Sequence, residues 1–174
     1  MSANSLTIAT QGVLLQGLAL LDECDSKAYA KVAPQPFGAS IGQHFRHVLD
    51  HFLCLASAIG VGTVNYDHRS RNRLIETSLE HARSHTEMLI WLFGTLTERE
   101  CVERCTVQCS VEYGEGESAS TESTFGRELA YCISHAVHHF AIMKLICSQM
   151  DVEVGEDFGV APSTLKYRAA QTLN

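Results

Sequence analysis

Apolar residues recur at intervals of three and four positions along most of the chain, a spacing that predicts amphipathic helices. Leu14, Leu18 and Leu21 form such a stripe in the first of them, with acidic residues outside it. The same periodicity returns three more times along the chain. The predicted helices span residues 5–31, 40–59, 77–96 and 124–150.

Polar residues at the starts of three of these segments predict where the helices begin. A Ser or Thr followed three residues later by Glu or Gln forms a capping box, in which each side chain accepts a hydrogen bond from the backbone N–H of the other residue. The predicted boxes are Ser40–Gln43 and Thr77–Glu80, and the fourth helix is capped by Ser123 or Thr124.

The period changes to two between Arg104 and Tyr113, where apolar and polar residues alternate as in a β-strand. Gly114–Gly116 supplies a turn, and residues 118–123 return as a second, more polar strand. We therefore expect a small β-hairpin, at about residues 102–123, between the third and fourth helices. Because cysteine commonly packs as a hydrophobe, three cysteines are interpreted as small apolar residues on one side of this hairpin: Cys101, Cys105 and Cys109.

These elements predict an all-α fold, a four-helix bundle with a small β-hairpin. The connection at residues 61–76 is long for a helical hairpin, so it is expected to cross the end of the bundle as a long crossover. No internal repeat or linker divides the sequence, and residues 1–174 are expected to form a single helical domain. A C-terminal tail is expected at about residues 151–174, with a short turn opened by Ser163.

Composition and charge exclude several classes of protein. The chain is 45% hydrophobic and 19% charged, as in globular proteins, and its formal net charge of −7 argues against a nucleic-acid-binding surface. The first residues lack a secretory signal, and no apolar run approaches the ~20 residues that span a bilayer. Seven cysteines without a CxxC pair indicate reduced thiols. We therefore expect a cytoplasmic protein with no nucleic-acid or membrane partner.

The fourth predicted helix carries the first candidate chemistry. His135 and His139 are four residues apart, so they lie one turn apart on one face, and two imidazoles at this spacing can meet a single ion. Glu128 and Cys132 fall on the same stripe in earlier turns, and His138 adjoins it. A face that is apolar at one end and carries these groups at the other is unusual for a plain core helix.

The second predicted helix carries another histidine cluster. His44, His47 and His51 are three and four residues apart, so they fall within ~60° of one another around the helix axis. Asp50 follows His47 by three residues. Burying several imidazoles costs free energy unless each finds a partner, and one metal ion satisfies three at once. We therefore favour a metal site shared by the two helices over hydrogen-bonded core histidines.

Ligand chemistry narrows the possible site. Three histidines leave a coordination position open, as in catalytic zinc sites, whereas structural zinc is closed by four protein ligands. Two histidines with a carboxylate suit iron(II), and Glu128 keeps that arrangement open. Ligand type alone allows zinc, nickel, iron or cobalt. Asp50 and Glu128 are the carboxylates expected to accept a hydrogen bond from a ligating histidine.

Three further residues are candidates for chemistry at this site. Cys132 lies in the middle of a helix and is interpreted as a buried thiol rather than a nucleophile. Arg69 and Arg71, in the long connection, either hold an anionic substrate or are simply solvated.

These residues resemble the DinB-like, or YfiT-like, superfamily of metal-dependent enzymes, which is the damage-inducible DinB family and not the translesion polymerase. Gln43–His51 matches the pattern of its second helix, and His135–His139 matches its second histidine pair. The resemblance implies that the metal ligands are His47, His135 and His139, with His44, His51 and His138 as neighbouring candidates. Three other stretches resemble an uncharacterised subgroup: Tyr66–Arg69, Ser123–Leu129 and Phe158–Leu165.

The resemblance also implies an up-down-down-up bundle that is often a homodimer. Known members of the family include thiol S-transferases that use bacillithiol or mycothiol and an isomerase that uses mycothiol. The sulfoxide synthases of thiohistidine biosynthesis carry a related iron-binding domain. A small-molecule substrate and a low-molecular-weight thiol are therefore expectations that rest on the resemblance.

Two functions from different classes are consistent with such a site. The first is a metal-dependent transferase or hydrolase in which the open coordination position activates a small thiol or water. The alternative is a non-enzymatic metal-binding or stress-responsive protein whose metal only stabilises the bundle. A plainer third interpretation is a dimerising helical bundle in which the histidines are incidental.

Overall fold

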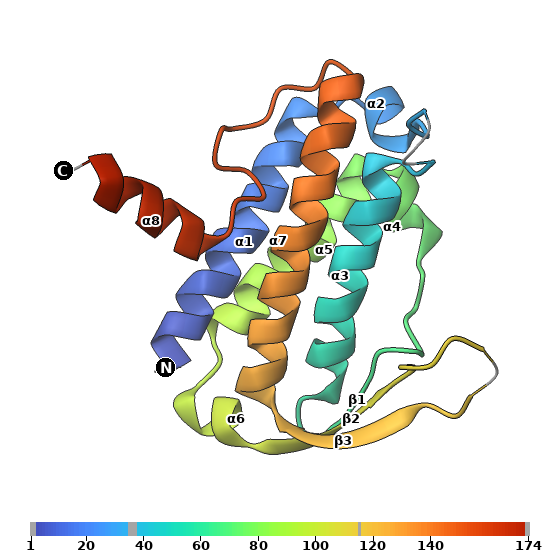
Figure 1. Cartoon of the computed structure of the whole chain (residues 1–174). Helices are drawn as coiled ribbons and strands as arrows, with labels where there is room; N and C mark the ends of the chain where they lie inside the picture. Colours follow the sequence, from blue (N-terminus) through green and yellow to red (C-terminus); the bar gives the residue numbers. More distant parts are fainter. Residues whose placement is uncertain (1–2, 35–37, 115, 173–174) are drawn as a thin grey trace.

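Four long helices lie side by side in the computed structural model, which describes residues 3–34, 38–114 and 116–172 (Figure 1). They are α1 (Ala3–Glu23), α3 (Ile41–Ala58), α5 (Leu79–Gly94) and α7 (Phe125–Gln149). In the view of Figure 1, α1 and α7 run upward, while α3 and α5 run downward. Helix α1 packs against α5 and α7, and α3 packs against the same two helices, so the four enclose one apolar core.

Large aromatic and aliphatic side chains fill the space between the four helices. Phe45, Phe52, Phe93 and Phe140 are each at most 1% exposed. The rings of Phe52 on α3 and Phe93 on α5 meet edge to face, with their centroids 5.8 Å apart. The helical stripes seen in the sequence therefore face one another, and this ring contact packs α3 against α5.

The helix starts agree with the sequence at two of the three predicted caps. The Ser40 box is formed: the side-chain oxygens of Ser40 and Gln43 each accept a hydrogen bond from the other residue's backbone N–H. Thr124 caps α7. The predicted box at Thr77 is wrong, because Thr77 is the last residue of a short helix, α4 (Arg73–Thr77), and Ser78 caps α5 instead.

The first helix is not continuous over residues 5–31 as predicted. Helix α1 ends at Glu23, and the Asp25 carboxylate accepts a hydrogen bond from the backbone N–H of Ala28 at 2.6 Å to start α2 (Ser26–Ala30). The break allows Tyr29 to be completely buried, with its hydroxyl donating to the carbonyl of Ile75 at 2.6 Å. The Asp25 cap and the hydrogen bond from Tyr29 to the distant Ile75 carbonyl therefore account for the early end of the first helix.

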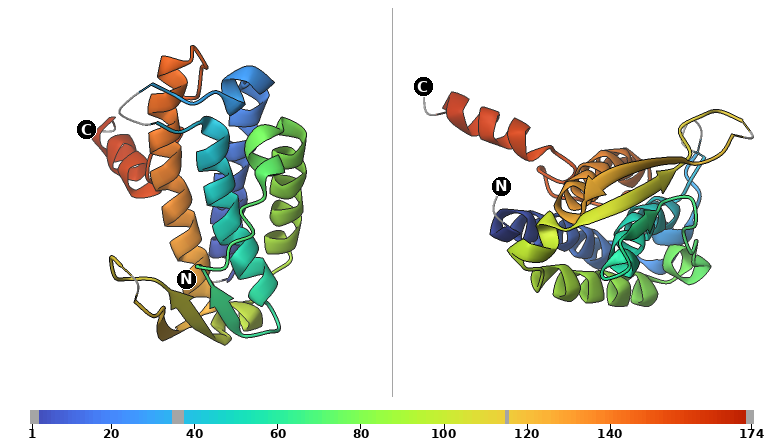
Figure 2. Two further views of the ribbon diagram at one scale, coloured as in Figure 1. Left: turned by 90° about the vertical axis from the view of Figure 1, so that its right-hand side faces the viewer. Right: turned by 90° about the horizontal axis from the view of Figure 1, so that it is seen from below.

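The predicted hairpin is part of a three-stranded sheet at the lower end of the bundle (Figures 1 and 2). Strands β2 (Arg104–Cys109) and β3 (Ala119–Thr124) are antiparallel, while β1 (Thr63–Asn65) pairs with β2 in parallel. Strand β2 ends at residue 109 rather than 113, and Glu115 in the predicted turn lies outside the described residues. The long connection thus contributes an edge strand that its own sequence does not reveal.

A short helix, α6 (Glu98–Val102), links α5 to β2 and was not predicted. Cys101 at its end and Cys105 on β2 are buried, and Cys109 is half-buried. All three are free thiols that pack against the apolar core as small apolar residues, but Cys101 lies on α6 and not on the hairpin as predicted.

The C-terminal segment is more ordered than the predicted tail. Phe158 stacks on Phe140 of α7 with ring centroids 4.9 Å apart. Gly159 follows with a φ of +69°, and a Cβ at this position would overlap the backbone at Ala141. Beyond this contact, α8 (Pro162–Thr172) is a helix rather than a short turn, has no buried residue, and projects from the bundle (Figures 1 and 2).

Helices α1 and α7 are each long and apolar enough, by length and composition, to cross a membrane. From the sequence, no segment had been predicted to be long and apolar enough to span a bilayer. Core helices of soluble bundles meet the same criterion, and α7 carries Glu128 and the histidine pair on its inward stripe.

Gly42 makes a close contact that predicts a large effect of substitution. It lies in the first turn of α3, where a Cβ would overlap the carbonyl oxygen of Glu76 in α4. We expect Gly42→Ala to lower the free energy of unfolding by about 1–3 kcal/mol, because the backbone of α4 must move away. Urea unfolding measures this change.

Gly12 in α1 is the matched control, since its position has open space for a Cβ. Gly12→Ala is expected to raise the free energy of unfolding by about 0.5–1 kcal/mol through helix propensity. Equal effects of the two substitutions would contradict the proposed close contact at α4.

Candidate metal centre

Histidines from two antiparallel helices meet on the inner face between α3 and α7, which lie side by side in Figure 1. His44, His47 and His51 descend along α3, while His135 and His139 ascend along α7. Each set recurs at helical spacing, so each presents its imidazoles on one stripe. The antiparallel packing then pairs the start of one stripe with the end of the other.

Three of these side chains form a tight group. His47, His135 and His139 each offer a ring nitrogen, and the three nitrogens lie within 4.8 Å of one another. The Nε2 atoms of His47 and His135 are 3.1 Å apart. All three residues are half-buried, so the group is both sheltered and accessible from solvent.

The three neighbouring histidines take different positions around this group. His44 places its Nδ1 atom 3.0 Å from Nδ1 of His139. His51 is 3% exposed, donates its Nδ1 proton to the carbonyl of His47 at 2.9 Å, and lies with its ring centroid 4.1 Å from that of His135. His138 is exposed, and its ring centroid lies 5.3 Å from that of His139.

Burial keeps the grouped imidazoles neutral. Removal from water lowers the pKa of His47 and His135 to about 3 and that of His139 to about 4, and repulsion between neighbouring imidazoles acts in the same direction. The positive charge of Arg69 adds to the effect at His47. At neutral pH each of the three rings therefore has a free lone pair for a ligand.

The donor set fits a divalent ion of the zinc type. Tetrahedral zinc with Zn–N distances of about 2.0–2.1 Å requires ligand nitrogens about 3.3 Å apart, close to the separation found between His47 and His135. Among the described residues, three side chains place a possible ligand atom in this group, one nitrogen each from His47, His135 and His139. An ion held by them keeps one coordination position for another molecule.

The two expected carboxylates border the site but bond elsewhere. Asp50 is buried at 1% exposure and accepts a hydrogen bond from Ser70 at 3.3 Å, and burial raises its pKa. Glu128 accepts hydrogen bonds from the hydroxyls of Tyr66 and Ser123, at 3.0 and 2.6 Å. In the described part of the chain, neither carboxylate forms a hydrogen bond with a histidine.

Two tyrosines complete the surroundings of the histidines. Neither was predicted to belong to the site, although Tyr66 lies in one of the stretches that resemble the uncharacterised subgroup. Tyr66, in the long connection, stacks on His51 with ring centroids 5.3 Å apart, and Tyr131 stacks on His135 at 5.7 Å. Tyr131 was detectable, because it precedes His135 by four residues on the same helical stripe. Tyr66 could not be placed at the site in this way, because it lies outside the helices. It reaches His51 only because the connection passes beside α3.

Cys132 is buried rather than available for catalysis. Its side chain is 1% exposed, and its sulfur lies 3.7 Å from the Tyr66 hydroxyl. Burial raises the pKa of this thiol to about 12, so it stays protonated at neutral pH. A protonated buried thiol is a poor nucleophile, in agreement with the interpretation from the sequence.

A cavity of about 300 Å3 adjoins the cluster between α3, α7 and the sheet. Its lining includes His51, Tyr66 and Tyr131, together with Arg69. Arg69 donates a hydrogen bond to the carbonyl of Tyr66 at 2.8 Å. Arg71 is exposed and has a positive φ of 47°.

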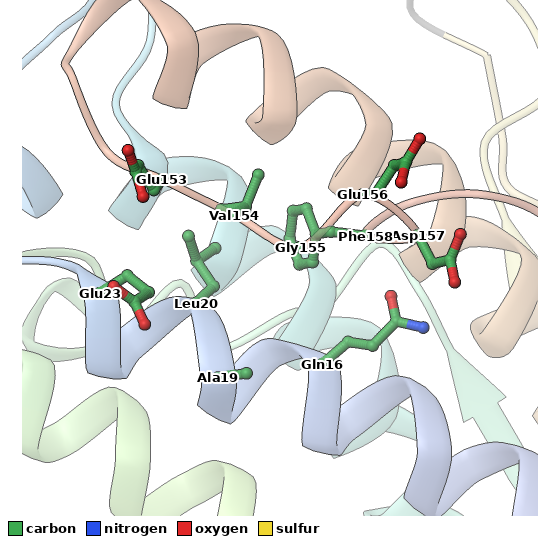
Figure 3. A pocket seen from close by; sticks show the side chains of 10 residues that line it. All are labelled: Gln16, Ala19, Leu20, Glu23, Glu153, Val154, Gly155, Glu156, Asp157 and Phe158. Atoms are coloured by element: carbon green, nitrogen blue, oxygen red, sulfur yellow. The ribbon is translucent and has the colours of Figure 1, made fainter.

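A larger cavity of about 570 Å3 lies away from the histidines, between α1 and the segment after α7 (Figure 3). Its lining includes four carboxylates, those of Glu23, Glu153, Glu156 and Asp157. None of the histidines reaches it. The smaller cavity is therefore the one associated with the candidate metal centre.

Comparison with known proteins identifies the fold. The crystal structure of the DinB-like protein YjoA from Bacillus subtilis superposes with a TM-score of 0.60 over 90% of this chain and 97% of that chain, at 17% sequence identity. The predicted DinB-like fold is thus confirmed. No protein-family model matches the sequence.

One curated protein is similar at the level of sequence. FK506-binding protein 5 of Rhizopus delemar is 34% identical over 116 residues, which is 65% of this chain. The matched region makes up 29% of that relative, so this chain corresponds to less than a third of its length.

Proposed function

We propose that this chain is a metal-binding protein of the DinB-like fold in which His47, His135 and His139 hold one divalent ion. The observation that carries the proposal is the group of three neutral imidazole nitrogens within 4.8 Å of one another. Zinc, nickel and iron all accept such a ligand set, and imidazole alone does not select among them.

The open coordination position supports an enzymatic role as part of this proposal. A divalent ion bound there supplies Lewis acidity to a small thiol or water, so the proposed activity is that of a thiol S-transferase or a hydrolase. The surrounding residues would position the reactants: His51 is held by its hydrogen bond to His47, and the rings of Tyr66 and Tyr131 stack on His51 and His135. A small-molecule electrophile would enter from the adjoining cavity.

The second candidate function is a metal site without chemistry. His44 and His51 lie against the group of three, with a 3.0 Å contact between His44 and His139 and a 4.1 Å ring separation between His51 and His135. A rotation of either ring would supply a fourth ligand and close the site. A closed site would stabilise the bundle or store metal.

Ligand counting and turnover together separate the two functions. We expect the cobalt-loaded protein to have the absorption spectrum of three histidines with an exchangeable fourth ligand, which shifts when a thiol such as mercaptoethanol is added. We expect conjugation of thiols to a panel of electrophiles to require metal and to be lost in His135→Ala and His139→Ala.

His138→Ala, on the exposed side of the same helix, is the control and should retain turnover. A spectrum of four histidines that no thiol alters would establish the closed site. Conjugation that survives chelation would also contradict the proposed enzyme.

We further propose a cytoplasmic homodimer. All seven cysteines are free thiols, which suits a reducing compartment. Leu15 on α1 and Trp91 on α5 are 54% and 68% exposed beside one another, and they give the bundle an apolar face for a second copy.

A further inference from the structure

The cavity beside the histidine cluster is lined by charged side chains as well as by aromatic ones. Two cations and two carboxylates line it: Arg69, Arg127, Asp67 and Glu128. Buried or half-buried charges are retained only where partners compensate them. The partners of these four groups therefore indicate which of them remain available for a ligand.

Both carboxylates are already engaged by the protein. Asp67 accepts hydrogen bonds from the hydroxyl of Ser118 and from the backbone N–H of Ser110, which ties the connection to the two ends of the hairpin. Glu128 accepts from Tyr66 and Ser123. Their oxygens are thus committed to internal donors rather than to a bound cation.

The two arginines keep most of their donors free. Arg69 uses one N–H of its guanidinium for the carbonyl of Tyr66, and a guanidinium has five N–H donors. Arg127 is exposed at the first turn of α7. Within residues 3–34, 38–114 and 116–172, neither arginine forms an ion pair with a carboxylate. The planar guanidinium fork suits a carboxylate or phosphate group.

The remaining lining combines two tyrosine rings with smaller side chains, His51 and Ser110 among them. Val107 and Cys109 of β2 line the same cavity as Tyr66 and Tyr131, whose ring centroids are 5.4 Å apart. The volume of about 300 Å3 is at the lower end of the range for small-molecule pockets. A ligand that matches both sides has an anionic head and a compact apolar body.

We propose that this cavity binds a small organic anion, with its carboxylate or phosphate on Arg69 and Arg127 and its apolar body against Tyr66 and Tyr131. The inference rests on the proposed function, since it places the anion as a substrate beside the metal centre. The anion contacts themselves involve no metal ligand, so binding takes place with or without the ion.

Benzoate is a suitable probe, benzamide its neutral counterpart and phenyl phosphate the second anion. We expect isothermal titration calorimetry to give benzoate binding at least about tenfold tighter than benzamide binding, in both chelated and metal-loaded protein. Arg69→Gln and Arg127→Gln are each expected to weaken benzoate binding by about tenfold. Whichever of benzoate and phenyl phosphate binds more tightly identifies the preferred head group.

Arg168→Gln on the exposed helix α8 is the matched control and should bind benzoate as the unaltered protein does. Benzamide binding as tight as benzoate binding would overturn the proposal, as would unchanged affinity in both cavity variants or no binding of either anion. Zinc titration of the same proteins tests the metal centre separately. Arginine-dependent anion binding in a protein that takes up no zinc would leave this inference standing and refute the proposed metal site.

Discussion

His135→Ala is expected to lower the affinity of the protein for zinc by at least about 100-fold. Substitution of residues that merely orient a ligand costs about 10–100-fold in metal affinity, and removal of one of three ligands costs more. The Nε2 atom of His135 lies 3.1 Å from the Nε2 atom of His47, so no solvent-filled gap separates these two proposed ligands. Competition with a chromophoric chelator measures the loss directly.

Thermal unfolding gives a second measure of the same substitution. A ligand present at 100 times its dissociation constant stabilises the native state by about 2.7 kcal/mol, so zinc should raise the Tm of the unaltered protein and leave that of His135→Ala unchanged. His138→Ala, three residues away on the exposed side of α7, should bind zinc within about threefold of the unaltered protein. Wild-type zinc affinity in His135→Ala would refute the proposed site.

The metal-free protein is expected to lose stability as the pH falls from about 6.5 to 4. Burial lowers the pKa of His47 and His135 to about 3 and that of His139 to about 4, whereas the same residues titrate near 6.5 in the unfolded chain. Above pH 6.5 the rings are neutral in both states and contribute no pH dependence. Below it the unfolded state binds more protons, so the free energy of unfolding falls with decreasing pH.

The slope of this dependence is measurable by urea unfolding in a chelating buffer at a series of pH values. Each such histidine adds up to about 1.4 kcal/mol per pH unit within the window. His135→Ala removes one contribution and should flatten the curve, while Ser134→Ala on the exposed side of α7 should leave it unchanged. Parallel curves for all three proteins would show that the buried imidazoles titrate normally.

Local sequence signals correctly indicated the helical elements that carry the site. The spacing of three and four residues places His44, His47 and His51 on one stripe of α3, and the same rule pairs His135 with His139 on α7. The Ser40 capping box depends on residues three positions apart, and it forms as predicted. The resemblance to DinB-like proteins drew on the same short patterns.

Short elements were the ones the sequence did not reveal. Strand β1 has only three residues and exists because it pairs with β2, some 40 positions later in the chain. Asp25 broke the first helix through a cap that competes with helix continuation, and the buried partner of Tyr29 lies in α4. Such contacts depend on which distant segments meet after folding. The spacing of apolar residues within one segment therefore cannot predict them.

By itself the sequence determined that two helices would each present a stripe of histidines, because the helical repeat fixes side-chain direction within a helix. The tertiary structure decided which imidazoles meet. Packing of α3 against α7 in antiparallel register sets the approach of His47 to His135 and His139, and it leaves His138 in solvent. It also brought Tyr66 and Arg69 to the site from the long connection. Relative rotation and register of two helices depend on how their apolar side chains interdigitate, which is a property of both surfaces together.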